Sequence, residues 1–279
     1  MIPSHIFREY DIRGKANAEL TEEVALAIGK AFGTVLVREG KKKVAIGHDH
    51  RWSAEFLYRG LTEGLRSTGL TVIRIGLVPT PVVYFYVTTQ NMDAGISLTG
   101  SHNPPDENGF KFHHATRSFY GADIQNLRNL IERNDFVTGD GKVETPDHES
   151  LLKDYENYIA NIFKFTKRLK VVIDTGHGMG AVTALGLVKR FGHDLTVLYG
   201  DLDSKMPDHQ ADPSVPANMK DLQAKVLELK ADIGIAFDGD ADRIGVVNEK
   251  GEIIYGDKLL LIYARELLAR KPGATIIGD

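Results

Sequence analysis

Cysteine is absent from the 279-residue sequence, which excludes disulfides, thiolate metal sites and cysteine nucleophiles. A strong net charge is absent too, and the formal charge of −4 at pH 7 gives no support to a nucleic-acid partner or an anionic membrane surface. No apolar run is long enough to span a bilayer, and the N-terminal residues lack the basic and apolar regions of a signal peptide. These absences predict a soluble, cytoplasmic protein with no nucleic-acid or membrane partner.

The remaining composition is that of an ordinary globular protein, with 42% hydrophobic and 26% charged residues. The chain is longer than a single compact core usually is, so we expect two domains. Strand-like and helix-like patterns alternate through both halves, which predicts two successive α/β domains with mainly parallel, mixed sheets covered by helices. We expect the first domain at residues 1–150, the second at 151–256, and the start of a truncated third α/β unit at 257–279.

The expected elements follow from apolar runs and helical periodicity. Thr21 is expected to cap the first long helix, because its hydroxyl can accept a backbone hydrogen bond and acidic residues follow it at the positive end of the helix. Helices are also expected at 122–133, 181–191 and 257–270. Strands are expected at 44–47, 70–77, 94–98, 170–174, 195–199, 232–237, 243–248 and 274–279.

Three carboxylates stand at alternate positions directly after an apolar strand, in the sequence Asp238-Gly-Asp240-Ala-Asp242-Arg243. Two like charges about 4 Å apart repel by roughly 4 kcal/mol at an effective dielectric constant of about 20, so three converging carboxylates need a cation. Oxygen ligands without nearby His or Cys favour magnesium or another hard divalent ion over zinc. One alternative is a solvated acidic turn. The other is a calcium-binding EF-hand, but Arg243 stands at the sixth position, where an EF-hand has glycine, and the flanks are strand-like rather than helical.

A second unusual loop, Thr99-Gly-Ser-His-Asn-Pro104, follows the strand expected at 94–98. A serine hydroxyl is a weak nucleophile that needs activation, and this loop lacks the G-x-S-x-G elbow of a hydrolase, so a plain turn is the alternative interpretation. Soon after it, Asn108-Gly-Phe-Lys111 supplies a glycine turn and a cation that can fold back over an anion. Ligands bind outside the carboxyl ends of strands in such sheets, so both loops are expected to face a ligand.

With these loops in one chain, the sequence resembles the α-D-phosphohexomutase family. The Thr99–Pro104 loop matches the phosphoserine loop of that family, and the loop at Asp238–Arg243 matches its magnesium loop. Phe7-Arg-Glu-Tyr-Asp-Ile-Arg-Gly14 matches its N-terminal signature, and residues 108–111 match the segment that carries a catalytic lysine. The resemblance covers essentially all 279 residues and is strongest to the phosphomannomutase/phosphoglucomutase group.

The resemblance implies an isomerase that interconverts hexose 1-phosphate and hexose 6-phosphate, with mannose or glucose as the sugar. A phosphoserine and a bisphosphorylated hexose would be the intermediates, and hexose 1,6-bisphosphate would be the activator. Ser101 would carry the phosphate, and one Mg²⁺ would be held by Ser101 together with Asp238, Asp240 and Asp242. Such transfer depends on positioning and charge neutralisation, and Mg²⁺ together with Arg243 would offset the developing negative charge.

The same resemblance implies roles for six further residues. Lys111 would be the general acid or base, because a lysine crowded by cations can have its pKa lowered. Arg243 would offset the developing negative charge and bind phosphate. Tyr10 and Arg13 would line the cleft beside Ser101 and bind the substrate. His102 and Asn103 would shape the serine loop and contact the phosphate, and His102 is counted among the catalytic residues as an organiser of that loop rather than as a base.

The sequence departs from the family pattern, because the sugar-specificity loop and the distal phosphate clamp of the family's third and fourth domains do not occur in it. We therefore expect little or no mutase activity from these residues alone, since the remote phosphate lacks a binding site. Two other functions stay open: a non-enzymatic or split-protein module that self-associates or binds a partner chain through 257–279, and a Mg²⁺-dependent phosphatase. A further turn, Gly176-His-Gly178-Met-Gly180, fails the spacing of a dinucleotide site and is interpreted as a tight strand-to-helix turn.

Overall fold

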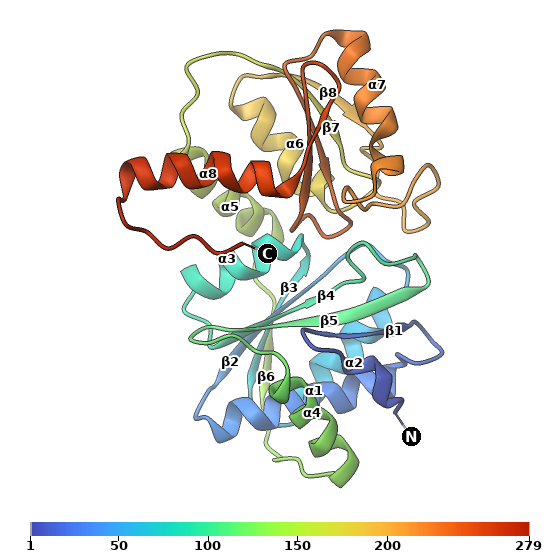
Figure 1. The fold of residues 1–279 in the computed structure, drawn as a ribbon. Coiled ribbons are helices and arrows are strands. Elements are labelled where there is room, and N and C mark those ends of the chain that lie inside the picture. The colour runs from blue at the N-terminus through green and yellow to red at the C-terminus, as the bar shows by residue number, and fades with distance from the viewer. Residues whose placement is uncertain (1, 279) are drawn as a thin grey trace.

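The computed structural model describes residues 2–278, which form two α/β units in chain order (Figure 1). The strands of the first unit are β1 (Ile12–Lys15), β2 (Lys43–His48), β3 (Thr71–Leu77), β4 (Ala94–Leu98), β5 (Glu107–His114) and β6 (Lys142–Glu144). Its helices are the 3-10 helix η1 (Ser4–Ile6) and the α-helices α1 (Glu22–Arg38), α2 (Ala54–Arg66), α3 (Thr80–Thr89), α4 (Ala122–Arg133) and α5 (His148–Ile162).

The second unit is built in the same way. Its strands are β7 (Lys170–Asp174), β8 (Asp194–Leu198), β9 (Ile233–Phe237), β10 (Ile244–Asn248) and β11 (Ile253–Ile254). Its helices are α6 (Gly180–Arg190), the 3-10 helix η2 (Pro216–Met219), α7 (Lys220–Leu229) and α8 (Gly256–Arg270). Among residues 2–278, no helix combines the length and the apolar character needed to cross a membrane.

The strands form one mixed sheet in each unit. The first sheet has the order β1-β5-β4-β2-β3-β6, and the second has the order β11-β10-β9-β7-β8. β2 pairs in parallel with β3 and β4, and β7 pairs in parallel with β8 and β9, whereas β5 and β10 pair antiparallel with their neighbours. The expected class, two mixed α/β sheets covered by helices, is confirmed.

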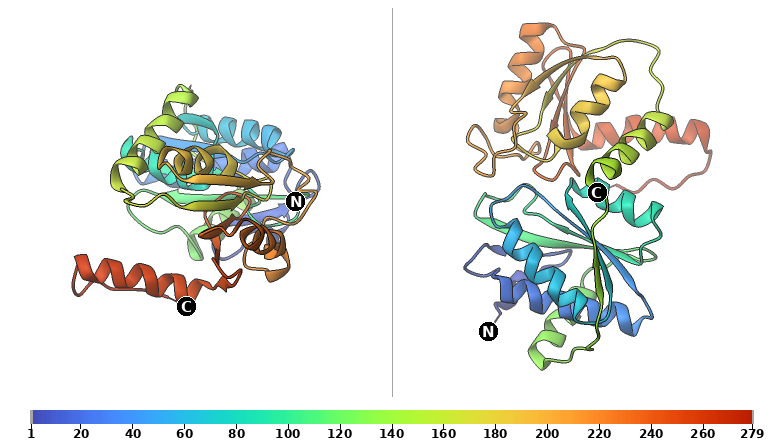
Figure 2. Two further views of the ribbon diagram at one scale, coloured as in Figure 1. Left: turned by 90° about the horizontal axis from the view of Figure 1, so that it is seen from above. Right: turned by 180° about the vertical axis from the view of Figure 1, so that it is seen from behind.

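Helices cover both faces of the first sheet because successive side chains of a strand point to opposite sides. On β2, Val44 and Ile46 belong to the core under α1, α2 and α4, whereas Ala45 belongs to the core under α3 and α5. In the second unit, α7 covers one face of the sheet. The helix α5 contacts both α3 and α6, so it links the two units where they meet (Figures 1 and 2).

Most of the expected elements are found close to their expected limits. Thr21 does accept a hydrogen bond from Val24 N at the start of α1, and the helix expected at 122–133 is α4. The turn expected at 108–111 is wrong, because these residues lie inside β5, which pairs with β4. The expected boundary after residue 150 falls inside α5, and the domain limits stay a prediction.

The strand expected at 274–279 is also wrong over residues 274–278, which have no regular structure, whereas Asp279 lies outside the described residues. A strand needs a hydrogen-bonded neighbour, and within residues 2–278 this segment has none. The helix expected before it is present as α8, but Leu259 is its one buried residue in the described part of the chain. Figure 2 shows α8 extending away from the body of the second unit.

Replacing Thr21 with alanine should lower the free energy of unfolding by about 1 kcal/mol, because Val24 N loses its hydrogen-bond acceptor at the N-terminus of α1. Urea denaturation measures this loss. Thr88→Ala is the matched control, since Thr88 is exposed near the end of α3 and its hydroxyl only bonds back to Tyr84 O. Equal losses in the two variants would contradict the capping role.

Candidate active site

The loop that follows β4 brings Ser101 to the junction of the two units. Ser101 is only 1% exposed, and its Oγ donates a hydrogen bond of 2.7 Å to Asp238 Oδ2 of the second unit. Its backbone has a φ of 49°, in the left-handed region that non-glycine residues rarely adopt. Ser101 N donates to Thr99 Oγ1 at 2.8 Å, which satisfies the backbone of this strained turn.

The buried side chain of Arg51 holds the serine loop in place. The guanidinium of Arg51 donates to four backbone oxygens of the loop and the strand after it, those of Ser101, Asn103, Pro104 and Glu107. Asp49 pairs with Arg51 at 3.3 Å and accepts a hydrogen bond from Gly100 N. A Cβ at Gly100 would stand 2.2 Å from Arg51 Cζ, so glycine is required there.

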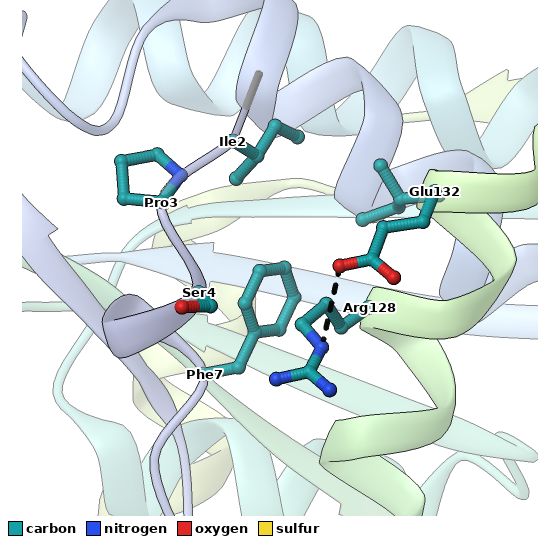
Figure 3. A pocket seen from close by; sticks show the side chains of 7 residues that line it. Ile2, Pro3, Ser4, Phe7, Arg128 and Glu132 are labelled. Carbon is teal, nitrogen blue, oxygen red and sulfur yellow. Dashed lines mark ion pairs between the residues drawn. The ribbon is translucent and has the colours of Figure 1, made fainter.

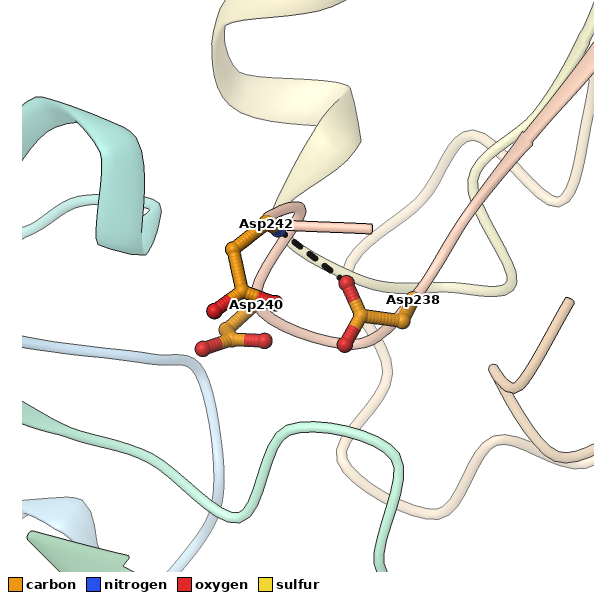
Figure 4. Close-up of side chains that lie close together, drawn as sticks. All are labelled: Asp238, Asp240 and Asp242. Atoms are coloured by element: carbon orange, nitrogen blue, oxygen red, sulfur yellow. Dashed lines mark hydrogen bonds between the residues drawn. The ribbon is translucent and has the colours of Figure 1, made fainter. Parts of the chain in front are cut away.

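The acidic loop joins β9 to β10 and gathers its three carboxylates (Figure 4). One oxygen from each of Asp238, Asp240 and Asp242 lies within 4.8 Å of the others. Asp238 and Asp240 are buried, whereas Asp242 is exposed. Asp238 Oδ1 accepts hydrogen bonds from the backbone N–H groups of Asp242 and Arg243, which closes the loop.

Burial and repulsion strongly perturb these carboxyl groups. Burial raises the pKa of Asp238 to about 8, and the charges of Asp240 and Asp242 add to that shift. Burial opposes ionisation of Asp240 as well, but the charge of Lys111 and hydrogen bonds from Lys111 and Thr80 lower its pKa to about 2. Without a metal ion, the cluster therefore keeps a proton on Asp238 near neutral pH.

The cluster also fits a divalent cation. Asp240 Oδ1 is buried and has no hydrogen-bond partner among the described residues, although a buried acceptor normally has one. It belongs to the same three carboxylates that converge within 4.8 Å. An all-oxygen set of this kind suits Mg²⁺ or a similar hard ion, and the strands on both sides of the loop exclude an EF-hand.

Lys111 reaches this cluster from β5 of the first unit. Its Nζ lies 2.7 Å from Asp240 Oδ2 and 2.5 Å from Asp242 Oδ2. Burial opposes its charge, but the two carboxylates outweigh burial and raise the pKa of Lys111. The expected lowering of this pKa is therefore wrong for the structure as it stands, because anions rather than cations surround the amine.

The other expected site residues line one cleft of about 380 Å³ beside the two loops. Arg13 is buried and fixed, with Nε 2.7 Å from Asp11 Oδ2 and a second nitrogen donating to Thr99 O. Tyr10 is the most open, with 73% of its surface exposed and its ring stacked on Tyr120. The remaining expected members of this lining are His102, Asn103, Lys111, Asp242 and Arg243.

His102 lies between Ser101 and the half-exposed side chain of Arg243. Its Nδ1 is 3.2 Å from Ser101 Oγ and 3.3 Å from a guanidinium nitrogen of Arg243. Burial, with the charge of Arg243, lowers the pKa of His102, so this ring is neutral at physiological pH. Asn103 uses its amide to donate to Glu107 Oε2, which keeps that side chain within the loop.

Several residues of the site were not expected from the sequence. Arg51 and Asp49 hold the serine loop, and Thr80 donates to Asp240 Oδ2 at 2.6 Å. Arg8 and Tyr84 also line the cleft. The one local signal was the short polar run Asp49-His-Arg51 directly after the apolar strand β2, at a strand end like the other two loops.

A larger pocket of about 810 Å³ lies elsewhere, between the N-terminal segment and α4 (Figure 3). Its walls are mainly Ile2, Phe7 and Ile131, and its polar groups Arg128 and Glu132 pair with each other at 3.5 Å. No residue of either loop lines it. The larger of these two cavities is therefore not the one at the serine and acidic loops.

Replacing Arg51 with methionine should destabilise the protein by about 3–5 kcal/mol, because the buried Asp49 and four carbonyls lose their partner. Arg51→Lys should recover only part of this loss, since an ammonium cannot match the planar fork. Urea denaturation measures both variants. Arg38→Met removes an exposed ion pair to Asp135 and serves as the control; a loss there as large as in Arg51→Met would refute the argument.

Asp240→Asn should weaken binding of Mg²⁺ or Mn²⁺ at least about tenfold, because a ligand charge is lost from the cluster. Calorimetry should also show proton release near neutral pH, since Asp238, with its pKa raised to about 8, must ionise to bind metal. This release should disappear well above pH 8, where Asp238 is already ionised. Asp221→Asn, an exposed carboxylate bonded to Tyr199, is the control, and equal affinities in both variants would contradict the site.

Comparison with known proteins agrees with this architecture. Two family models, described as alpha/beta/alpha domains I and II of phosphoglucomutase/phosphomannomutase, match residues 4–138 and 153–251. A phosphomannomutase/phosphoglucomutase of Pseudomonas aeruginosa is 44% identical over 100% of this chain, and a phosphoglucomutase of Neisseria meningitidis is 39% identical over 100%. The crystal structure of a phosphoglucomutase/phosphomannomutase family protein from Burkholderia thailandensis superposes with a TM-score of 0.94 at 41% identity.

The comparisons also show how much of those proteins the chain represents. It spans 59% of the Pseudomonas protein, 60% of the Neisseria protein and 61% of the Burkholderia chain, while 98% of this chain is covered in the structural match. The two family models together include both the serine loop and the acidic loop. On the strength of these matches, the chain belongs to the phosphoglucomutase/phosphomannomutase family.

Proposed function

We propose that these residues form the phosphoryl-transfer half of a phosphohexomutase that interconverts hexose 1-phosphate and hexose 6-phosphate. The observation that carries the proposal is the 2.7 Å contact between Ser101 Oγ and Asp238 Oδ2, which joins the two family loops across the two units. The relatives are named for mannose and glucose phosphates, so these two hexoses are the proposed substrates.

Asp238, Asp240, Asp242 and Ser101 Oγ would hold one Mg²⁺, which fits the unpartnered Asp240 Oδ1 and the converging carboxylates. When bound, the ion supplies positive charge that offsets the charge on the phosphoryl oxygens. Arg243, with a half-exposed side chain that lines the cleft, can swing towards the same oxygens. Arg13 cannot move in this way, because Asp11 and Thr99 fix it, so its task is to hold the serine loop.

In the proposed step from phosphorylated Ser101, the bond between Oγ and phosphorus breaks as phosphorus bonds to a hexose hydroxyl oxygen. Lys111 is charged in this structure, so it can donate a proton to the leaving Oγ. The neutral amine that results can then take the proton of the hydroxyl, which balances the transfer. The hexose bisphosphate formed in this way would reorient and return its other phosphate to Ser101, which accounts for hexose 1,6-bisphosphate as the activator.

Incubation with glucose 1,6-bisphosphate and Mg²⁺ should add the mass of one phosphoryl group to the chain, because Ser101 is the proposed acceptor. Intact-mass spectrometry detects the addition, and Ser101→Ala should abolish it. Ser118→Ala is a suitable control, since Ser118 lies near the cleft but outside both loops. An unmodified wild-type chain, or a phosphorylated Ser101→Ala variant, would refute the proposal.

A coupled assay on the same samples separates mutase from phosphatase activity. Residues 1–279 alone should convert hexose 1-phosphate slowly or not at all, because the distal phosphate clamp of the family does not occur in their sequence. Turnover equal to that of a full-length relative would contradict this expectation. Steady phosphate release that depends on Asp240 would instead favour the phosphatase alternative.

A second candidate role, as a module that assembles with a partner, is favoured by the surface of α8. Leu261, Ile262 and Tyr263 are between 54% and 63% exposed on this helix. Scattered exposed apolar residues are common, but consecutive helical residues point to different sides, so α8 leaves apolar side chains exposed on several sides, where a neighbour would normally bury them. The occupant we propose is a polypeptide equivalent to the rest of the relatives' chains, and native mass spectrometry with that polypeptide tests it.

A further inference from the structure

The segment between β8 and η2, residues 199–215, reaches across to the serine loop. Gln210 Nε2 donates a hydrogen bond to His102 O, the carbonyl next to Ser101. The same segment contacts the first unit a second time, where His50 Nε2 lies 3.2 Å from Asp203 O. The 199–215 segment therefore contacts the serine loop through Gln210 and the loop after β2 through Asp203, and neither contact involves the three metal-loop carboxylates.

The position of Gln210 is fixed from within the second unit by the residue before it. His209 Nε2 lies 3.0 Å from Oδ2 of Asp174, which is fully buried at the carboxyl end of β7. The other oxygen of Asp174 accepts a hydrogen bond of 2.8 Å from Gly176 N. A buried carboxylate with both oxygens occupied is a rigid anchor, because releasing either partner would leave a buried charge unsatisfied.

The glycine turn Gly176–Gly180 joins this anchor to the metal loop. Gly176 has a φ of 52°, and a Cβ there would stand 2.8 Å from Ala211 Cβ of the 199–215 segment. On its other side, Met179 N donates to Gly239 O at 2.9 Å, and a Cβ at Gly178 would stand 2.9 Å from that same oxygen. One turn therefore contacts both the segment that holds His102 and the loop that holds the carboxylates.

Charge strengthens the anchor at neutral pH. The hydrogen bond to Asp174 raises the pKa of His209 to about 8, against the effect of burial, so the pair is ionic below that pH. Asp221 of α7 contributes to the shift, and the ring of Tyr199 packs edge-on against His209. The neighbouring pair of His177 Nε2 and Asp208 Oδ2, at 2.7 Å, fastens the same segment to the glycine turn.

We propose that Asp174, His209 and Gln210 form a latch that sets the register of Ser101 against the metal loop. His209 is a positioning residue in this arrangement, since it touches neither Ser101 nor the three carboxylates. The latch gives the glycine turn a role beyond the tight strand-to-helix turn expected from the sequence. Its catalytic consequence rests on the proposed phosphoryl transfer, whereas its structural consequence does not.

Hydrogen–deuterium exchange tests the structural consequence directly. Gln210→Ala should raise exchange of residues 99–104 about tenfold and leave residues 199–215 little changed, because only the contact to His102 is lost. His209→Asn should raise exchange in both segments. Gln223→Ala is the matched control, because Gln223 Nε2 makes a bond of the same kind to Gly251 O in the same unit.

Measuring hydrogen–deuterium exchange of the wild type and of His209→Asn over a range of pH tests whether the charge of His209 matters. A side chain that acted only by packing would give a difference that does not depend on pH. The excess protection of the wild type over His209→Asn should be full below about pH 6.5 and shrink as the pH rises through about 8, where His209 loses its proton. A difference that is independent of pH would remove the ionic anchor from the proposal. Unchanged exchange at 99–104 in Gln210→Ala would overturn the latch altogether.

The rate of Ser101 phosphorylation by glucose 1,6-bisphosphate measures the catalytic consequence. Both latch variants should phosphorylate about tenfold more slowly, because Ser101 is no longer held in register with the metal loop. Their Mg²⁺ affinity should fall less than that of Asp240→Asn, since the three carboxylates themselves are kept. If the wild type is never phosphorylated, the proposed function fails and the exchange data still decide the latch. If His209→Asn does not fold, Gln210→Ala decides it, because Gln210 is exposed and its replacement removes one hydrogen bond.

Discussion

Two buried carboxylates in one loop impose the electrostatic constraint on which the rest of the structure depends. Asp238 and Asp240 are each no more than 1% exposed, so water does little to screen their repulsion. The structure offsets it with a proton on Asp238, the ammonium of Lys111 and the hydroxyls of Ser101 and Thr80. The last three come from the first unit, so the second unit does not satisfy this loop by itself.

The serine loop and the acidic loop can contact each other because each emerges at the end of a strand. The serine loop follows β4 and the acidic loop follows β9, and the units face each other at those ends, with α5 packed on both. Burying an ion costs several kcal/mol, which is comparable to what its new partners return at about 1.5–3 kcal/mol for each charged hydrogen bond. The charged contacts therefore fix geometry, while the apolar cores supply most of the stability.

Local sequence patterns were sufficient to predict the features that depend only on residues close together in the chain. The α4 limits, the cap at Thr21 and the acidic loop after β9 follow from spacing within a few residues. The contact of Arg51 with the serine loop could not be predicted in this way. Arg51 and Ser101 are 50 positions apart, and the acceptors are backbone carbonyls, which every residue has and which the sequence therefore does not mark. The strand expected at 274–279 is wrong over 274–278 for a similar reason, since a strand forms only where another strand lies beside it to pair with.

Lys111 shows the same limit in its chemistry. From the sequence, we expect cations to crowd Lys111 and to lower the pKa of its amine. The structure adds Asp240 and Asp242, which lie 129 and 131 positions further along the chain and reverse the sign of the shift. A pKa is set by spatial neighbours, so the identity of a functional lysine can be predicted from a motif while its charge state cannot.

The two oxygens of Asp240 show how a lysine and a metal ion can share the site. Lys111 and Thr80 both bind Oδ2, whereas Oδ1 is buried and has no partner among the described residues. Lys111 bridges Oδ2 of Asp240 and Oδ2 of Asp242, so it supplies part of the positive charge that the cluster needs, but it leaves Oδ1 of Asp240 unpartnered among the described residues. Because one oxygen is used and the other is free, Lys111 can hold Asp240 in place while Oδ1 binds a metal ion. The carboxylate is thus oriented by the first unit for a ligand that the second unit binds.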